Sequence, residues 1–150
     1  MTGSNWRVRG IIAEYAAFVV AFACSTDASD YAGIEFTIRG NAGPSGQLVL
    51  QAQHAGNAPG STERPGVATC SGNCASASTT IAVSSTETVV RLPWSAFTGG
   101  SPMASVDATQ LAQIKWIFAW NSQMVPYSVD VVVDNLRFIA KTDVDGGATD

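Results

Sequence analysis

The chain has 150 residues, which suits one domain with its own hydrophobic core better than two domains. Its net charge of −4 lacks the positive surface that attracts nucleic acids and anionic membranes, and no run approaches the ~20 apolar residues that span a bilayer. We therefore expect no nucleic-acid or membrane partner. Charged residues make up 13% of the chain, so Ser, Thr, Gly, Asn and Gln supply most of the polar surface, as in many secreted β-proteins.

Short runs rich in Val, Ile, Thr and aromatic residues alternate with clusters of Gly, Pro, Asn and Ser, and helical periodicity is almost absent. This pattern predicts an all-β domain over residues 1–140, followed by an acidic, Gly-rich linker or tail over residues 141–150. One helical turn, capped by Asp107, is expected before the strand that begins at residue 114. The expected strands are residues 6–12, 14–24, 34–38, 47–54, 81–83, 88–92, 114–120 and 127–139.

The three cysteines divide into a pair and a single residue. Cys70 and Cys74 are four residues apart in the long polar loop 55–80, where a disulfide would restrain the loop in an oxidising, extracellular compartment. Zinc bound by the three cysteines and His54 is the alternative, although only one closely spaced ligand pair is present. Cys24 ends an apolar stretch that resembles a lipoprotein export signal, but Glu14 interrupts this stretch. We expect a strand there, with Cys24 as a buried free thiol.

Several segments, in this order along the chain, carry a resemblance to a known family. They are DASDYAGIEF at residues 27–36, CSGNC at 70–74, LPWSAFTGG at 92–100, IKWIFAW at 114–120 and VDVVVDNLRF at 129–138. Together they resemble bacterial secreted jelly-roll domains related to CBM11-like and galactose-binding-like carbohydrate-binding modules, over about residues 18–139.

This resemblance implies a two-sheet antiparallel β-sandwich, binding of glycans, attachment to a larger multimodular protein and often one structural calcium ion. Asp134 matches the family position associated with calcium; its alternatives are surface exposure or an ion pair with Arg137 or Arg39. Such domains usually open with a further strand ahead of residue 6, which is not found here. An open sheet edge would allow a homo-oligomer to form.

The candidate carbohydrate-binding residues combine amide side chains with aromatic rings, because a sugar presents apolar CH faces surrounded by hydroxyl groups. Gln51 and Gln53 lie on the polar side of their strand and His54 follows them; an ordinary solvated face is the alternative. Trp120 lies at a strand end beside Asn121, Ser122 and Gln123, where its ring can leave the core. Tyr127 begins the last strand, and its alternative is a packed tyrosine.

The other large aromatic residues are expected to have structural roles. Trp116 and Phe118 should lie in the core, and Trp94, after Pro93, should anchor a turn between the sheets. Trp6 is either a ligand platform or a plug at the sheet edge.

No catalytic arrangement is recognisable in the sequence. No pattern places two carboxylates together as glycoside hydrolysis requires, and the nucleophile-elbow, zinc-protease and phosphate-loop motifs are all missing. The prediction is a non-catalytic module for a neutral polysaccharide, cellulose or another β-glucan. A structural or adhesive protein that assembles through an open sheet edge is the alternative.

Overall fold

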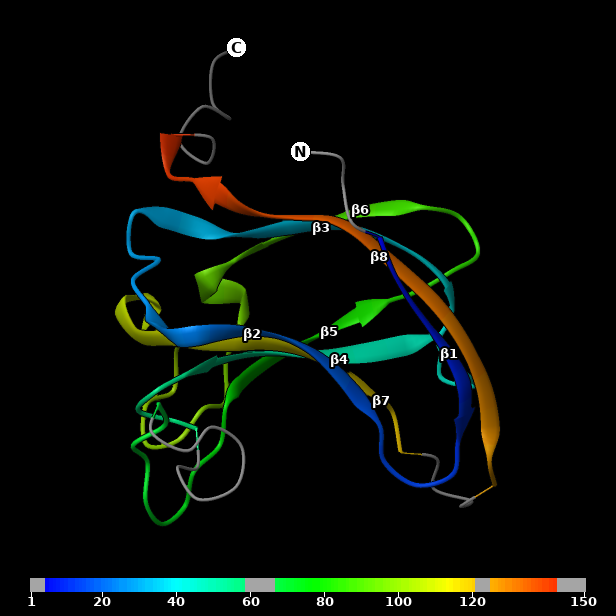
Figure 1. Cartoon of the computed structure of the whole chain (residues 1–150), viewed down its shortest axis with the longest axis horizontal. Helices are drawn as coiled ribbons and strands as arrows, with labels where there is room; N and C mark the ends of the chain where they lie inside the picture. The colour runs from blue at the N-terminus through cyan, green and yellow to red at the C-terminus, as the bar shows by residue number, and fades with distance from the viewer. Residues whose placement is uncertain (1–4, 59–66, 121–124, 143–150) are drawn as a thin grey trace.

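The computed structural model describes residues 5–58, 67–120 and 125–142. Two antiparallel four-stranded sheets pack face to face in these ranges, which confirms the predicted all-β sandwich (Figure 1). Sheet A has the strand order β1-β8-β3-β6, and sheet B has the order β2-β7-β4-β5. The strands are β1 (Trp6–Ile12), β2 (Ala17–Thr26), β3 (Tyr31–Asn41), β4 (Gln47–His54), β5 (Ala77–Ala82), β6 (Thr88–Pro93), β7 (Leu111–Phe118) and β8 (Tyr127–Ala140). None of the described helices is long and apolar enough to cross a membrane.

Alternation of apolar and polar residues determines which side of each strand faces the core, because successive side chains in a strand point to opposite faces of the sheet. On β3 the buried residues are Ile34, Phe36 and Ile38. On β4 they include Leu48 and Leu50, both fully buried. The two inner faces thus form a single core between the sheets.

Trp116 is at the centre of this core, as predicted, and Phe118 is buried on the same strand. The ring of Phe18 on β2 stacks on the Trp116 indole with a centroid distance of 5.1 Å. The Phe36 ring on β3 meets the Trp116 indole edge-on at 5.5 Å. Because Phe36 belongs to sheet A and Trp116 to sheet B, the Trp116 indole joins the two sheets.

The second strand starts later than predicted and leaves Cys24 exposed. Glu14 and Tyr15 form a bend, so β2 begins at Ala17. The pairing of β2 with β7 is irregular between Ala21 and Thr26. Cys24 lies in this irregular segment and is an exposed free cysteine. The prediction of a buried thiol was wrong, because the alternation that would turn Cys24 inward is lost there.

Two short 3-10 helices lie at the ends of strands; Asp107 caps one of them as predicted, whereas Trp94 is bonded within sheet A and not between the sheets. In η1 (Trp94–Ala96) the Trp94 indole nitrogen donates a hydrogen bond of 2.9 Å to the Tyr31 carbonyl oxygen. Ahead of η2 (Ala108–Gln110) the Asp107 carboxylate accepts from the backbone N–H of Thr109 at 3.0 Å. Both contacts fix chain segments at the same end of the sandwich.

Candidate functional site

The outer faces of the two sheets differ sharply in charge. On sheet A, Arg7 of β1 forms a bidentate pair with Asp130 of β8, with N–O distances of 2.7 and 2.8 Å. Glu35 of β3 lies between Arg91 of β6 and Arg137 of β8. Ion pairs therefore cover this face from one edge of the sheet to the other.

The outer face of sheet B is nearly uncharged. Strand register aligns its residues in rows across the four strands, because residues paired in adjacent strands lie on the same side. The rows are Ala17–Ile117–Val49–Thr80, Val19–Lys115–Gln51–Ser78 and Ala21–Gln113–Gln53. Lys115 is the single charged residue in these rows. The face thus offers amides, hydroxyls and small apolar side chains.

Three glutamines form a hydrogen-bonded chain across this face. The Gln113 amide nitrogen on β7 donates to the Gln53 side-chain oxygen on β4. The Gln53 amide nitrogen then donates to the Gln51 side-chain oxygen at 3.2 Å. Gln53 and Gln113 are buried, whereas Gln51 is partly exposed. Gln53 therefore orients Gln51, and Gln51 is the glutamine of the predicted pair that a ligand can reach.

Two exposed aromatic residues, Tyr15 and Trp120, flank the end of sheet B where β2 begins and β7 ends. Tyr15 comes just before β2 and is 60% exposed, and the Lys115 ammonium lies 5.6 Å from its ring centroid. Trp120 follows β7 and is 50% exposed, as expected for a ring that has left the core. Its neighbours in residues 121–124 lie outside the described part of the chain. In Figure 1 the β1–β2 connection projects beyond sheet B.

His54 and Tyr127 do not join this face. The His54 imidazole is fully buried, and burial lowers the pKa of His54. The Tyr127 ring packs against Gly43, where an added Cβ would come within 2.3 Å of the ring. The Tyr127 hydroxyl donates to the Ala119 carbonyl oxygen, and burial raises the pKa of Tyr127. The structure therefore gives Tyr127 the packing role that was the alternative.

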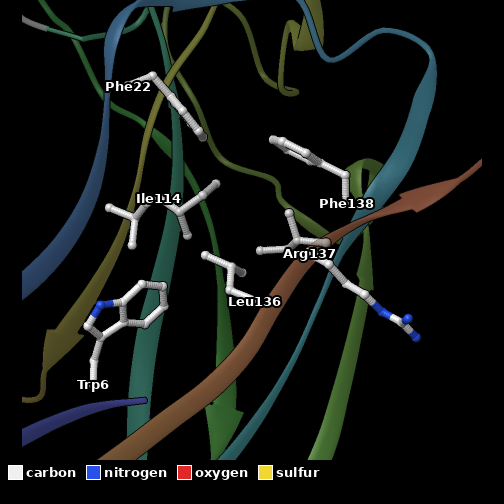
Figure 2. A pocket seen from close by; sticks show the side chains of 8 residues that line it. Trp6, Phe22, Ile114, Leu136, Arg137 and Phe138 are labelled. Atoms are coloured by element: carbon white, nitrogen blue, oxygen red, sulfur yellow. The ribbon is translucent and has the colours of Figure 1, made fainter. Parts of the chain in front are cut away.

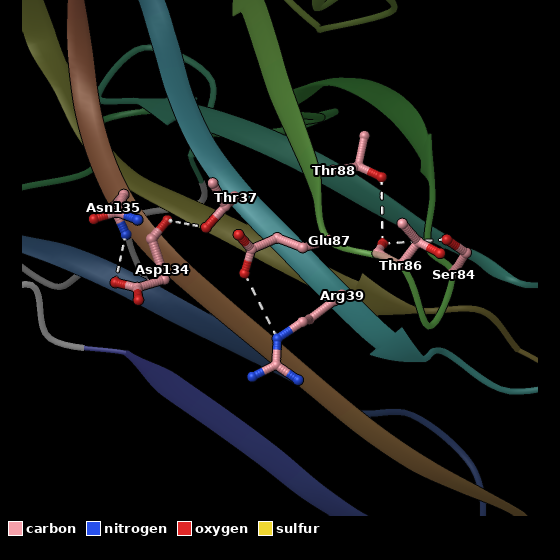
Figure 3. A network of polar contacts seen from close by, with 8 residues as sticks. All are labelled: Thr37, Arg39, Ser84, Thr86, Glu87, Thr88, Asp134 and Asn135. Atoms are coloured by element: carbon pink, nitrogen blue, oxygen red, sulfur yellow. Dashed lines mark hydrogen bonds and ion pairs between the residues drawn. The ribbon is translucent and has the colours of Figure 1, made fainter.

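Asp130 and Asp134 share the outer face of sheet A, but their surroundings differ. Figure 3 shows Asp134 beside Asn135, with the ion pair of Arg39 and Glu87 on the same face. Asp130 pairs with Arg7, and this hydrogen bond lowers the pKa of Asp130. The two arginines considered as partners of Asp134 pair with glutamates instead, Arg39 with Glu87 and Arg137 with Glu35. The Asp134 carboxylate accepts a hydrogen bond from the backbone N–H of Asn135 at 2.7 Å.

Calcium requires six to eight oxygen ligands. In the described ranges no three His, Cys, Asp or Glu side chains gather as a metal site would require. Calcium at Asp134 stays a prediction that would need other ligands.

Trp6 lies beside an apolar cavity of about 230 Å³ between the edges of the two sheets. Figure 2 shows Trp6, Phe22, Leu136 and Phe138 around this space, with the Arg137 guanidinium pointing away from it. The cavity lacks the polar groups that a sugar needs. The position of Trp6 matches a plug at the sheet edge better than a ligand platform.

Cys70 and Cys74 form the predicted disulfide, with Cα atoms 6.1 Å apart. This bond makes both sulfur atoms unavailable to a metal, so the alternative of a zinc site with three cysteines and His54 is wrong.

Tyr15, Lys115 and Gln113 were missed by the sequence analysis. Lys115 lies within the expected strand 114–120, and Gln113 lies just before it. Both residues alternate with Ile114 and Trp116, which indicates that their side chains point outward. Tyr15 was placed inside the expected strand 14–24, and its position ahead of β2 emerged only from the structure.

Sequence comparison does not assign the chain to a family, since no protein-family model and no curated protein matches it. Comparison of structures does find similar folds. One is a family 11 carbohydrate-binding module from Clostridium thermocellum in complex with a β-1,3-1,4-mixed-linked tetrasaccharide. It has a TM-score of 0.53 and 16% identity, covering 93% of this chain and 89% of the other.

A second similar structure is the family 11 module of the cellulosomal cellulase Lic26A-Cel5E of Clostridium thermocellum. Its TM-score is 0.51 at 16% identity, with 93% of this chain and 88% of that chain covered. At 16% sequence identity, this structural similarity establishes the fold of the domain alone. The chain therefore has the two-sheet fold of the family 11 carbohydrate-binding modules.

Proposed function

We propose that this domain binds a neutral polysaccharide of the β-glucan type on the outer face of sheet B, without reacting with it. The observation that carries the proposal is the nearly uncharged face, with Gln51 oriented by Gln53 and with the exposed Tyr15 ring beside Lys115 at one end. The exposed Trp120 follows β7 at the same end of the sheet. Such a face matches a neutral sugar chain, because amides bond hydroxyl groups and aromatic rings stack on CH faces.

The absence of carboxylates from this face supports binding without catalysis. Glycoside hydrolysis generally requires two carboxyl groups on either side of the scissile bond. The rows of described residues across sheet B contain no Asp or Glu. The fold supports the same function, since a similar structure holds a mixed-linked β-glucan tetrasaccharide.

The biological role that follows is targeting: the domain would hold an attached enzyme or a cell surface close to its polysaccharide. The Cys70–Cys74 disulfide supports an oxidising, extracellular location.

Retention on glycans tests the proposal. The folded protein and its variants are run through gels containing mixed-linked β-glucan, and are pulled down with cellulose, xylan, mannan and chitin. We expect retention on a β-glucan, and a loss of about fivefold in affinity for Trp120→Ala, because one stacked ring contributes roughly 1 kcal/mol. The control is Val89→Ala, which truncates a side chain that is 61% exposed on the other sheet. Absence of retention on every glycan would contradict the proposal.

A second candidate function is assembly through a sheet edge. β2 is an edge strand of ten residues with no charged residue and no Pro, and such edges lack the usual protection against pairing with another chain. Light scattering separates the candidates: a monomer at all concentrations favours the binding module, and a stable oligomer favours assembly.

A further inference from the structure

A second hollow with the properties of a sugar site lies at the end of the sandwich where β3 begins and β8 ends. Its volume is about 490 Å³, within the range of roughly 300–1,000 Å³ that is common for ligand pockets. We call it the end pocket; its lining includes Ser29, Tyr31, Trp94, Ser95, Thr109 and Lys141. None of these residues belongs to the outer face of sheet B.

The aromatic rings of the end pocket are held in place by the fold. Tyr31 is 40% exposed, and its ring stacks on Phe138 with a centroid distance of 5.0 Å. The Trp94 indole is bonded through its nitrogen to the Tyr31 carbonyl and lies 6.2 Å from the Phe138 ring. A ligand would therefore meet rings whose orientation is already set, which lowers the entropy cost of binding.

Hydrogen bonds also fix the part of the polar rim formed by Thr109 and by the turn that carries Ser29. The Thr109 hydroxyl donates to the Asp107 carboxylate at 2.6 Å, so its oxygen remains an acceptor held in one orientation. The backbone N–H of Ala28 bonds the Ala108 carbonyl at 2.7 Å and joins the turn that carries Ser29 to η2. Ser29, Ser95, Thr109 and Lys141 thus contribute polar side chains to the same lining as the two aromatic rings.

We propose that the end pocket binds a pyranose unit of a glycan, as a second site separate from the outer face of sheet B. The pairing of Tyr31 and Trp94 with a rim of hydroxyls matches the apolar faces and polar edge of a sugar ring. The apolar cavity beside Trp6 lacks such a rim. Two sites on one domain would raise its avidity for an insoluble polysaccharide, because the second contact forms within an already bound complex.

The experiment is a nitrogen–proton NMR titration of the whole chain with cellotetraose, xylotetraose and mannotetraose. The indole signals of Trp94 and Trp120 report on the end pocket and on sheet B respectively. We expect the Trp94 and Ser95 signals to shift along a binding curve of their own, for at least one of these sugars.

Two tyrosine variants provide matched controls. Tyr31→Ala should weaken the binding seen at Trp94 by about fivefold or more and leave the Trp120 curve unchanged. Tyr15→Ala removes an exposed ring beside Lys115 and should have the reverse effect. If Tyr31→Ala unfolds, Tyr31→Leu keeps an apolar contact with Phe138 while removing the aromatic ring.

Three results would overturn the second site. They are no shift at Trp94 with any of the three sugars, unchanged affinity at Trp94 in the folded Tyr31 variants, or loss of the Trp94 shift in Tyr15→Ala. The proposed function fails separately, if the Trp120 and Lys115 signals do not respond to any β-glucan.

Discussion

His54 lies at the end of β4 with its imidazole fully buried. Desolvation is the largest effect on the imidazole and lowers the pKa of His54, while the Asp107 carboxylate and the Ser105 backbone act in the opposite direction. The folded protein therefore keeps His54 neutral at a pH where the unfolded chain binds a proton.

This difference predicts that stability falls as the pH decreases below about 6.5, the ordinary pKa of histidine. Unfolding then takes up a proton, and the loss can reach about 1.4 kcal/mol for each pH unit until the folded pKa is reached. Thermal unfolding between pH 5 and 7 measures the effect. This window lies above the range in which Asp27 and Asp130 titrate, because hydrogen bonds lower the pKa of both carboxyl groups.

His54 is the only histidine in the chain, so His54→Gln provides a direct control. The Tm of this variant should depend much less on pH in the same window. An equal slope in both proteins would show that another group is responsible.

At the scale of elements, the loop between β4 and β5 is held by bonds within it and to its neighbours. The disulfide closes residues 70–74, and the backbone N–H of Cys70 bonds the Ala58 carbonyl at 3.3 Å. Ala75 forms a β-bridge with Ser101, and the Asn57 amide bonds the backbone of Met103. The disulfide is therefore one of several restraints on this part of the chain.

We predict that Cys70→Ser/Cys74→Ser folds and loses about 2 kcal/mol of stability, because a closed loop of so few residues restricts the unfolded chain only modestly. Tm should decrease by about 4–8 °C. Differential scanning calorimetry measures the decrease, and a reducing agent should lower the Tm of the parent but leave the variant unchanged. Failure of the double variant to fold would show that the disulfide is required for folding.

For the whole molecule, the main property is the separation of charge between the two outer faces. Every ion pair described above lies on sheet A, and such exposed pairs each contribute little to stability. Their arrangement still distinguishes the faces, because a charged side chain on sheet B would have to be stripped of water when a neutral chain binds.

It follows that glycan binding should be nearly independent of salt. Exposed charges are screened over about 8 Å at physiological ionic strength, so a partner held by charge would dissociate as salt increases. Isothermal titration calorimetry with a soluble β-glucan at 50 and 500 mM NaCl should give dissociation constants that agree within about twofold. A decrease in affinity of tenfold or more at high salt would locate the ligand on sheet A.

The local alternation of apolar and polar residues was sufficient to predict a strand wherever the burial of its residues followed from that strand alone. β1 and β4 have the predicted bounds, Trp116 lies in the core, and Asp107 caps its helical turn. The start of β5 was missed because Ala77, Ser78 and the two threonines after them resemble a loop. An edge strand needs few apolar residues, and Ala77 and Ile81 are the two buried residues of β5.

The sequence by itself determined the fold class, the disulfide and a polar, uncharged strand in the middle of the chain. Only the tertiary structure decided which of those polar residues a ligand can reach: Gln53 and His54 are buried, whereas Gln51 and Tyr15 are accessible. The physical reason is that alternation fixes the side of a sheet to which a residue points. Its exposure depends on segments distant in the sequence that pack over that side, and no local pattern records them.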